Sequence, residues 1–127
     1  MYDVTVKTGF AAAHQLRLYD GKYENLHGHN WTAQVTVEAD ELDHIGVGID
    51  FVKLKDMVEK VLNQLDYHNI NEIPPFDEQN PSAENIARWL FQELKVQINT
   101  GSTRIKRVEI CEMEGCGASY FERNISF

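Results

Sequence analysis

The sequence predicts an α+β fold, in which a four-stranded antiparallel sheet is covered on one face by two helices. Four segments alternate apolar and polar residues with a period of two, as half-buried strands do. Two segments between them place apolar residues three and four positions apart, as amphipathic helices do. In chain order the expected elements are strand 2–14, strand 28–38, helix 51–65, a second helix whose apolar stripe runs from Ile86 to Leu94, strand 107–112 and strand 118–127.

The first strand carries most of its apolar residues at even positions. Its alternation is interrupted around Thr8 and Gly9, where we expect a bulge. His14 continues the even parity, so we expect its side chain on the covered face near the end of the strand. The polar segment 17–25 that follows is expected to be a loop or a hairpin link.

The second strand begins with two histidines that are one residue apart, His27 and His29. Side chains two positions apart in an extended backbone point to the same face. The two histidines share their parity with the apolar residues from Trp31 to Val37, whereas the opposite parity is polar. Both imidazoles are therefore expected on the covered side of the sheet, where an unpaired polar group is costly.

The two helices have recognisable starts. Asp50 has the position of an N-cap for the first helix, which is expected to end near Leu65. Residues 66–69 then form an irregular connection. The second helix follows a proline-containing loop, and either Asn80 or Ser82 is expected to cap it.

Composition and length limit the class of protein. The chain has 127 residues, of which 43% are hydrophobic and 25% charged, and we expect residues 1–127 to form a single domain. The net charge of −8, without a cluster of Lys or Arg, argues against a nucleic-acid surface, although an anionic small molecule can still bind locally. No apolar run reaches bilayer length and the N-terminus lacks a signal peptide, so we expect no membrane contact. Cys111 and Cys116 are expected to be reduced thiols in a cytoplasmic protein.

Three histidines are candidate metal ligands: His14, His27 and His29. Three imidazole nitrogens form the ligand set of a catalytic Zn²⁺ site, in which the fourth position stays open for water or substrate. The alternative is that these are core histidines bonded to backbone carbonyl groups. The spacing of two histidines on one strand, with a third on matching parity, favours the metal. A purely structural zinc site is disfavoured, because such sites close all four positions and often use cysteine.

Two helices cover only one face of the expected sheet. Its other face and its outer strands stay exposed unless another copy of the chain pairs with them. We therefore expect a homo-oligomer.

Six short blocks follow one another along nearly the whole chain: Phe10-Ala11-Ala12-Ala13-His14, Leu26-His27-Gly28-His29-Asn30, Ile49-Asp50-Phe51, Leu65-Asp66, Asn80-Pro81-Ser82 and Cys111-Glu112. Together they resemble the 6-pyruvoyltetrahydropterin synthase / 6-carboxytetrahydropterin synthase family. The Ala-Ala-His block and the His-Gly-His block are the specific part of this resemblance.

The resemblance implies a zinc-dependent lyase that acts on 7,8-dihydroneopterin triphosphate. It implies the tunnelling fold, assembled into a multi-subunit barrel, typically a hexamer of two stacked trimers with active sites at subunit contacts. His14, His27 and His29 fall at the family's zinc ligands. Glu112 falls at its pterin anchor, where a carboxylate accepts two N–H bonds from the ring. Ser82 falls in a block expected to bind substrate.

Two positions depart from the family pattern. The family's catalytic cysteine falls at Tyr23, and the histidine of its Leu-Asp-His motif falls at Tyr67, with His68 one residue later. Either Tyr67 or His68 is therefore expected to form a proton relay with Asp66. Glu24 resembles the glutamate that replaces the cysteine in a variant branch of the family, although a glutamate also follows the cysteine in the ordinary branch.

The variant branch releases 6-hydroxymethyl-7,8-dihydropterin for folate synthesis, and we expect this product here. Breaking the bond between the first two side-chain carbons needs only a modest base for the second hydroxyl group, because zinc acidifies that hydroxyl. Glu24 is the expected base. One alternative is 6-carboxy-5,6,7,8-tetrahydropterin synthase of queuosine biosynthesis, with Cys116 as the replacement thiol. The other is a non-catalytic paralogue that binds pterin and zinc.

Overall fold

A computed structural model of the chain describes residues 1–123. Its five strands and two helices follow one another as β1 (Tyr2–His14), β2 (His27–Ala39), α1 (Phe51–Leu62), β3 (His68–Asn69), α2 (Ala83–Ile98), β4 (Thr103–Met113) and β5 (Cys116–Tyr120). Short 3₁₀ turns lie at Tyr19–Gly21 and Ile70–Glu72. Among the described residues, no helix is long and apolar enough to span a bilayer.

The strands form one sheet in the order β3-β1-β2-β4-β5. β1 and β2 are antiparallel and paired along their whole length, so the predicted antiparallel arrangement of the four long strands is confirmed. The bulge expected at Thr8 and Gly9 is wrong, because the β1–β2 register runs through both residues without a shift. Gly9 instead allows strands β1 and β2 to approach closely, since a Cβ there would lie 3.3 Å from the carbonyl oxygen of Trp31.

The short strand β3 was not expected, and it makes the sheet mixed rather than purely antiparallel. His68 and Asn69 pair in parallel with Ala12 and Ala13 of β1, where the sequence predicted an irregular connection. Two residues are too few to show an alternation of apolar and polar side chains, so no sequence pattern marks this strand.

Both helices start at the expected type of cap. The Asp50 side chain accepts hydrogen bonds from the N–H groups of Val52 and Lys53, and the Ser82 hydroxyl accepts one from Asn85 at 3.1 Å. Ser82, rather than Asn80, therefore caps α2. Helix α1 ends at Leu62, three residues before the expected end.

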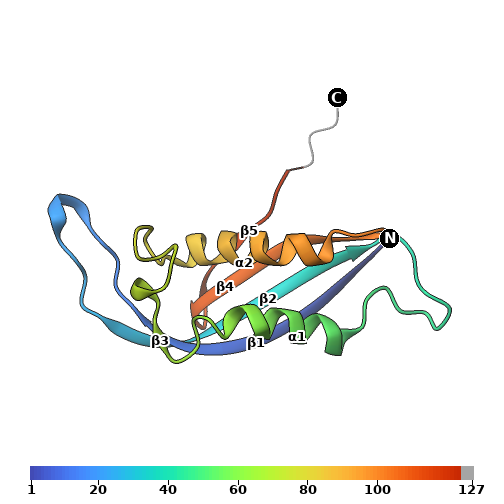
Figure 1. Cartoon of the computed structure of the whole chain (residues 1–127), viewed down its shortest axis with the longest axis horizontal. Coiled ribbons are helices and arrows are strands. Elements are labelled where there is room, and N and C mark those ends of the chain that lie inside the picture. The colour runs from blue at the N-terminus through green and yellow to red at the C-terminus, as the bar shows by residue number, and fades with distance from the viewer. Residues whose placement is uncertain (124–127) are drawn as a thin grey trace.

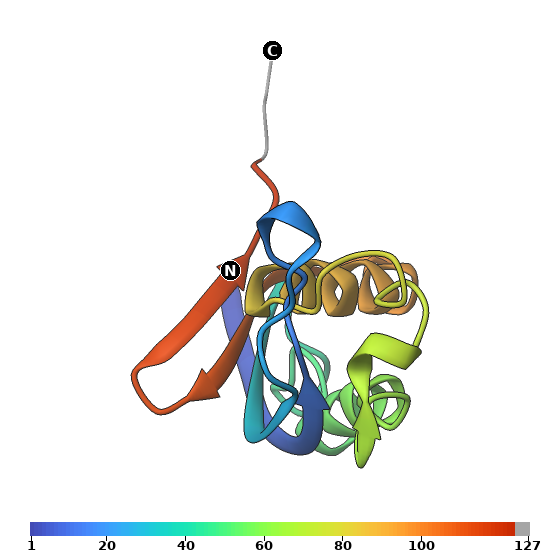
Figure 2. The same ribbon diagram turned by 90° about the vertical axis from the view of Figure 1, so that its left-hand side faces the viewer.

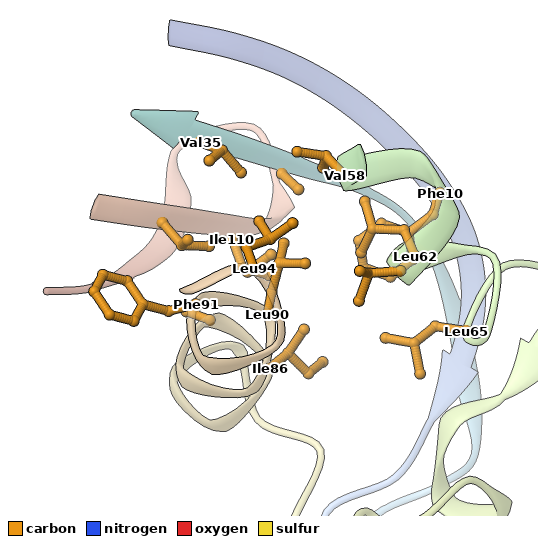
Figure 3. Close-up of a cluster of buried hydrophobic side chains, with 14 of the residues drawn as sticks. Phe10, Val35, Val58, Leu62, Leu65, Ile86, Leu90, Phe91, Leu94 and Ile110 are labelled. Carbon is orange, nitrogen blue, oxygen red and sulfur yellow. The ribbon is translucent and has the colours of Figure 1, made fainter. Parts of the chain in front are cut away.

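The helices lie side by side on one face of the sheet (Figures 1 and 2), which confirms the predicted layers. Between the layers lies a continuous apolar core, shown in part in Figure 3. Its fully buried members come from each of the main elements and include Trp31, Val35, Leu54, Val58, Ile86, Leu90, Leu94, Val108 and Ile110.

The connection between β1 and β2, residues 15–26, extends beyond the end of the sheet that lies away from the N-terminus (Figure 1). It is a hairpin link, as expected, with a bridge between Arg17 and Tyr23. At the other end of the chain, β5 covers Cys116–Tyr120. The expected last strand reached residue 127, and residues 124–127 lie outside the described part.

Candidate metal centre

The pairing of β1 with β2 brings the three histidines together. His14 faces His27 at the last pair of the ladder, and His29 faces Ala12 two positions earlier. The ring centroids of His14 and His27 are 4.7 Å apart, those of His27 and His29 also 4.7 Å, and those of His14 and His29 5.4 Å. His14 is only 1% exposed. The predicted convergence of the three imidazoles is therefore present in the fold.

A carboxylate from a third strand joins this group. Glu112, near the end of β4, places Oε1 2.8 Å from Nε2 of His14 and 3.2 Å from Nε2 of His29. One potential ligand atom from each of these four residues lies within 4.8 Å of every other. We call His14, His27, His29 and Glu112 the four-residue cluster.

Two imidazoles are oriented by backbone carbonyl groups. Nδ1 of His14 donates a hydrogen bond to the carbonyl oxygen of Pro81 at 2.8 Å, and Nδ1 of His27 donates one to the carbonyl oxygen of Asn25 at 2.7 Å. Because a carbonyl oxygen can only accept, the hydrogen atom of each neutral ring lies on Nδ1. The lone pair of each ring therefore lies on Nε2, the atom that faces the cluster in His14.

In this orientation, acceptor atoms face one another inside the four-residue cluster. Nε2 of His14 and Oε1 of Glu112 are both acceptors, yet they are 2.8 Å apart. In the described part of the chain, Nε2 of His14 and Nε2 of His29 are the buried side-chain atoms without a hydrogen-bond partner. Burial lowers the pKa of His29, although the Glu112 carboxylate acts in the opposite direction, so the neutral form of His29 is favoured. A cation between these atoms satisfies all of them at once.

Three imidazole nitrogens, with a further position open for a water or substrate oxygen, suit Zn²⁺ in particular. Ligand atoms of a tetrahedral zinc site lie about 2.1 Å from the metal and so about 3.4 Å from one another. The spacing within the four-residue cluster is compatible with this after small adjustments. The alternative interpretation, core histidines bonded to carbonyl groups, accounts for Nδ1 of His14 and His27 but leaves Nε2 of His14 and His29 without partners.

Glu24 lies in the hairpin beside this cluster but is not a member of it. Its backbone N–H donates to the carbonyl oxygen of Leu16, and its Oε1 accepts from the N–H of Leu16, both at 3.0 Å. Its negative charge raises the pKa of His29 slightly, so the carboxylate lies within electrostatic reach of the cluster. Tyr23, at the position of the family's cysteine, is largely exposed.

The Asp66–His68 segment lies along the outer edge of β1, and none of its side chains belongs to the four-residue cluster. Oδ1 of Asp66 accepts a hydrogen bond from the N–H of Ala11 at 2.8 Å. Tyr67 has a positive φ of 60° and an 87% exposed side chain. Tyr67 and His68 line a shallow pocket of about 540 Å³ that His29 also lines. They are thus connected to the cluster only through this pocket.

The other candidate residues lie nearby or on the surface. Ser82 caps α2 directly after Pro81, whose carbonyl group orients His14. Both cysteines are free thiols; Cys116 is exposed at the start of β5, across the β4–β5 pairing from Met113. Cys116 is not a member of the four-residue cluster.

Sequence reasoning missed the carbonyl groups of Pro81 and Asn25 as partners of the histidines. No residue pattern marks a backbone acceptor, because every residue has one. For His27, however, the strand pairing in the structure shows an irregularity that accompanies this contact. The β1–β2 ladder pairs His14 with His27, and the hairpin continues with Arg17 opposite Tyr23, which leaves one extra residue on the second strand. Such bulges commonly re-aim a side chain beside a site.

Comparison with known proteins identifies the family of the chain. The family model for 6-pyruvoyl tetrahydropterin synthase matches residues 3–123. The chain belongs to this family.

Two curated relatives illustrate the range of enzymes in the family. The chain is 33% identical over 109 residues to the dihydroneopterin monophosphate aldolase of Pyrococcus furiosus, covering 86% of this chain and 88% of that one. It is 31% identical over 131 residues to the 6-carboxy-5,6,7,8-tetrahydropterin synthase of Synechocystis, covering 99% and 98% of the two chains.

The fold is that of the family. The structure of the 6-pyruvoyl tetrahydropterin synthase of Caenorhabditis elegans superposes with a TM-score of 0.79 at 29% identity and covers 97% of this chain and 98% of that one. The expected tunnelling fold is thereby confirmed for the single chain.

Proposed function

We propose that the chain is a zinc-dependent lyase that cleaves the side chain of a 7,8-dihydroneopterin phosphate and releases 6-hydroxymethyl-7,8-dihydropterin for folate synthesis. The observation that carries this proposal is the meeting of three imidazoles beside Glu24, where the buried Nε2 atoms of His14 and His29 lack hydrogen-bond partners. The aldolase named for Pyrococcus furiosus supports cleavage of a carbon–carbon bond.

The proposed substrate carries either three phosphate groups or one. The family resemblance implies 7,8-dihydroneopterin triphosphate, whereas the Pyrococcus relative is named for the monophosphate. Both are therefore candidate substrates, and the reacting atoms are the same in each.

The proposed metal ligands are His14, His27 and His29. Zn²⁺ bound there would supply a Lewis acid that lowers the pKa of the second side-chain hydroxyl group of the substrate. A carboxylate such as that of Glu24 is too weak a base for an unactivated hydroxyl group but adequate for an acidified one. In the proposed mechanism Glu24 accepts that hydroxyl proton.

Loss of the hydroxyl proton leads to cleavage of the carbon–carbon bond. The bond between the first and second side-chain carbons breaks, and the second carbon leaves as an aldehyde. The electron pair of that bond passes into the pterin ring, and the first carbon then takes up a proton. Asp66 with Tyr67 or His68 would deliver this proton. Since these residues lie at the outer edge of β1, we propose that they act across a subunit contact, in the expected hexamer of two trimers.

Substrate binding is assigned to Glu112 and Ser82. Glu112 is 31% exposed, so one side of its carboxylate is accessible to a ring that presents two N–H groups. The same carboxylate approaches two imidazoles in the free chain. We propose that the pterin and the metal together satisfy the acceptors that face one another in this cluster.

The second candidate is 6-carboxy-5,6,7,8-tetrahydropterin synthase, supported by the relative from Synechocystis. This reaction requires a stronger base at the side-chain carbons, and the exposed thiol of Cys116, at the start of β5, is the candidate for it. The Cys116→Ser variant distinguishes the two: it leaves 6-hydroxymethyl-7,8-dihydropterin formation unchanged but abolishes formation of the carboxylated product. A third candidate, a paralogue without catalysis, binds zinc and pterin but turns over neither substrate.

Product identification tests the proposal directly. The zinc-loaded chain is incubated separately with the triphosphate and the monophosphate of 7,8-dihydroneopterin, and the pterins are separated by chromatography with mass detection. Release of 6-hydroxymethyl-7,8-dihydropterin from either substrate supports the proposal. Release of 6-carboxy-5,6,7,8-tetrahydropterin as the main product contradicts it, and so does the absence of any product.

A further inference from the structure

We propose that Asn80 is a positioning residue that sets the affinity of the metal centre through His14. Its side-chain amide pairs with both backbone groups of Arg17. Oδ1 of Asn80 accepts from the N–H of Arg17 at 2.7 Å, and Nδ2 donates to the carbonyl oxygen of Arg17 at 3.0 Å. The asparagine side chain thus makes the two hydrogen bonds that a neighbouring strand would make to the backbone of Arg17.

The chain between His14 and Arg17 is held on both sides. The amide of Asn71 makes the same reciprocal pair with the backbone of Gln15, at 2.8 Å for each bond. On the opposite side, Glu24 bonds both backbone groups of Leu16. The three residues after His14 therefore continue β1 in an extended form, although they lie outside its sheet ladder.

The backbone of Asn80 is joined directly to the residue that hydrogen-bonds His14. The next residue, Pro81, provides the carbonyl oxygen that accepts from Nδ1 of His14. The carbonyl oxygen of Asn80 itself accepts from Nδ2 of Asn85 at 2.9 Å, which fixes this turn at the start of α2. Asn80 thereby joins the segment that follows His14 to the acceptor that orients its ring.

Arg17 strengthens the same connection. Its guanidinium group donates to the carbonyl oxygens of Phe76, Asp77 and Gln79 at 2.9 to 3.0 Å. The backbone of Arg17 is thus tied to Asn80 and its side chain to the loop before Asn80. We call the contacts between Arg17 and residues 76–80 the Arg17–Asn80 clamp.

The clamp acts on the metal through orientation alone. His14 binds a cation well only when its hydrogen atom stays on Nδ1 and its Nε2 lone pair points at the cluster, and the Pro81 carbonyl group enforces both. Loss of an outer partner of this kind typically weakens metal binding by about 10–100-fold. A mutation at Asn80 is expected to have this effect although Asn80 does not touch the cluster.

The test measures binding of Co²⁺, a spectroscopic substitute for Zn²⁺, to the metal-free full chain. The wild type is compared with Asn80→Ala, with Asn71→Ala and with Asn63→Ala. Asn71→Ala loses an equivalent reciprocal pair that does not lead to Pro81, and Asn63 is exposed after α1. Thermal unfolding of each metal-free variant separates lost stability from lost affinity.

We expect Asn80→Ala to weaken Co²⁺ binding by about 10–100-fold and to alter the visible Co²⁺ bands. Asn71→Ala is expected to lower the melting temperature similarly but to change the dissociation constant by less than about threefold, and Asn63→Ala to change neither. Equal losses of affinity in Asn80→Ala and Asn71→Ala would overturn the proposal, as would unchanged affinity in Asn80→Ala. If Asn80→Ala does not fold, Asn80→Asp, which keeps only the acceptor, must weaken binding relative to wild type.

This inference rests on the metal centre of the proposed function, and the two fail differently. A wild type that does not bind Co²⁺ refutes the metal centre itself. A wild type that binds Co²⁺ with an Asn80→Ala variant of equal affinity refutes only the role of Asn80.

Discussion

Nδ1 of His14 and the carbonyl oxygen of Pro81 are 2.8 Å apart, although 67 positions separate them in the chain. This hydrogen bond joins the end of β1 to the loop before α2. It also decides which nitrogen of His14 is free to bind a cation, because the carbonyl group can only accept. The metal-binding ability of a strand residue therefore depends on a distant loop.

Removing one of the histidines is expected to abolish tight metal binding. His27→Ala deletes a ligand atom, so the zinc dissociation constant should rise more than about 100-fold, beyond the loss typical of outer partners. Titration against a chromophoric chelator measures it. His44→Ala, at an exposed loop position, is the matched control and should bind zinc like wild type. Tight binding by His27→Ala would remove His27 from the metal site.

Replacing Glu24 by glutamine is expected to separate catalysis from folding. Glutamine keeps an oxygen that accepts from the N–H of Leu16, so the hairpin is retained, but it cannot take up a proton. We expect kcat to fall by about 10²–10⁴-fold while the zinc dissociation constant stays within about threefold. Steady-state kinetics and metal titration of the same preparation measure both. A kcat equal to that of wild type would exclude Glu24 as the base.

Replacing Glu112 by glutamine distinguishes a pterin anchor from a metal ligand. The proposed anchor makes charge-assisted bonds to two N–H groups, so Glu112→Gln should raise KM at least about tenfold. Zinc affinity should stay nearly constant, because the three histidines remain. A loss of zinc affinity comparable to that of His27→Ala would show instead that Glu112 is a ligand.

The packing of α2 against the sheet should dominate stability. Leu90 is fully buried between the layers (Figure 3), so Leu90→Ala is expected to lower the free energy of unfolding by about 2–5 kcal/mol. Val96, on the same helix, is 81% exposed, and Val96→Ala should change the free energy of unfolding by less than about 0.5 kcal/mol. Urea denaturation monitored by circular dichroism measures both. Similar losses in the two variants would contradict the placement of Leu90.

The parts of the fold that could be predicted from sequence are those with a long periodic pattern. The alternation in β1 and β2 predicted which histidines share a face, and the helical spacing predicted the buried side of α2. Strand β3 and the end of α1 were not predicted, because each depends on two or three residues in contact with β1 rather than on a repeated pattern.

The same distinction holds for the site. Parity alone predicted that His14 would lie with His27 and His29. The approach of Glu112 to His14 depends on the β2–β4 register, which shifts between Thr36 and Val37 and cannot be counted from sequence. The pairing of Asn80 with Arg17 uses a side chain in place of a strand, and the residue type alone does not show this.

X-ray absorption at the zinc edge of the zinc-loaded chain is the most direct test of the metal centre. Three imidazole nitrogens at about 2.0–2.1 Å and an additional exchangeable oxygen ligand are expected. A sulfur ligand at about 2.3 Å, or fewer than three imidazoles around the zinc, would contradict the assignment of His14, His27 and His29 as its ligands.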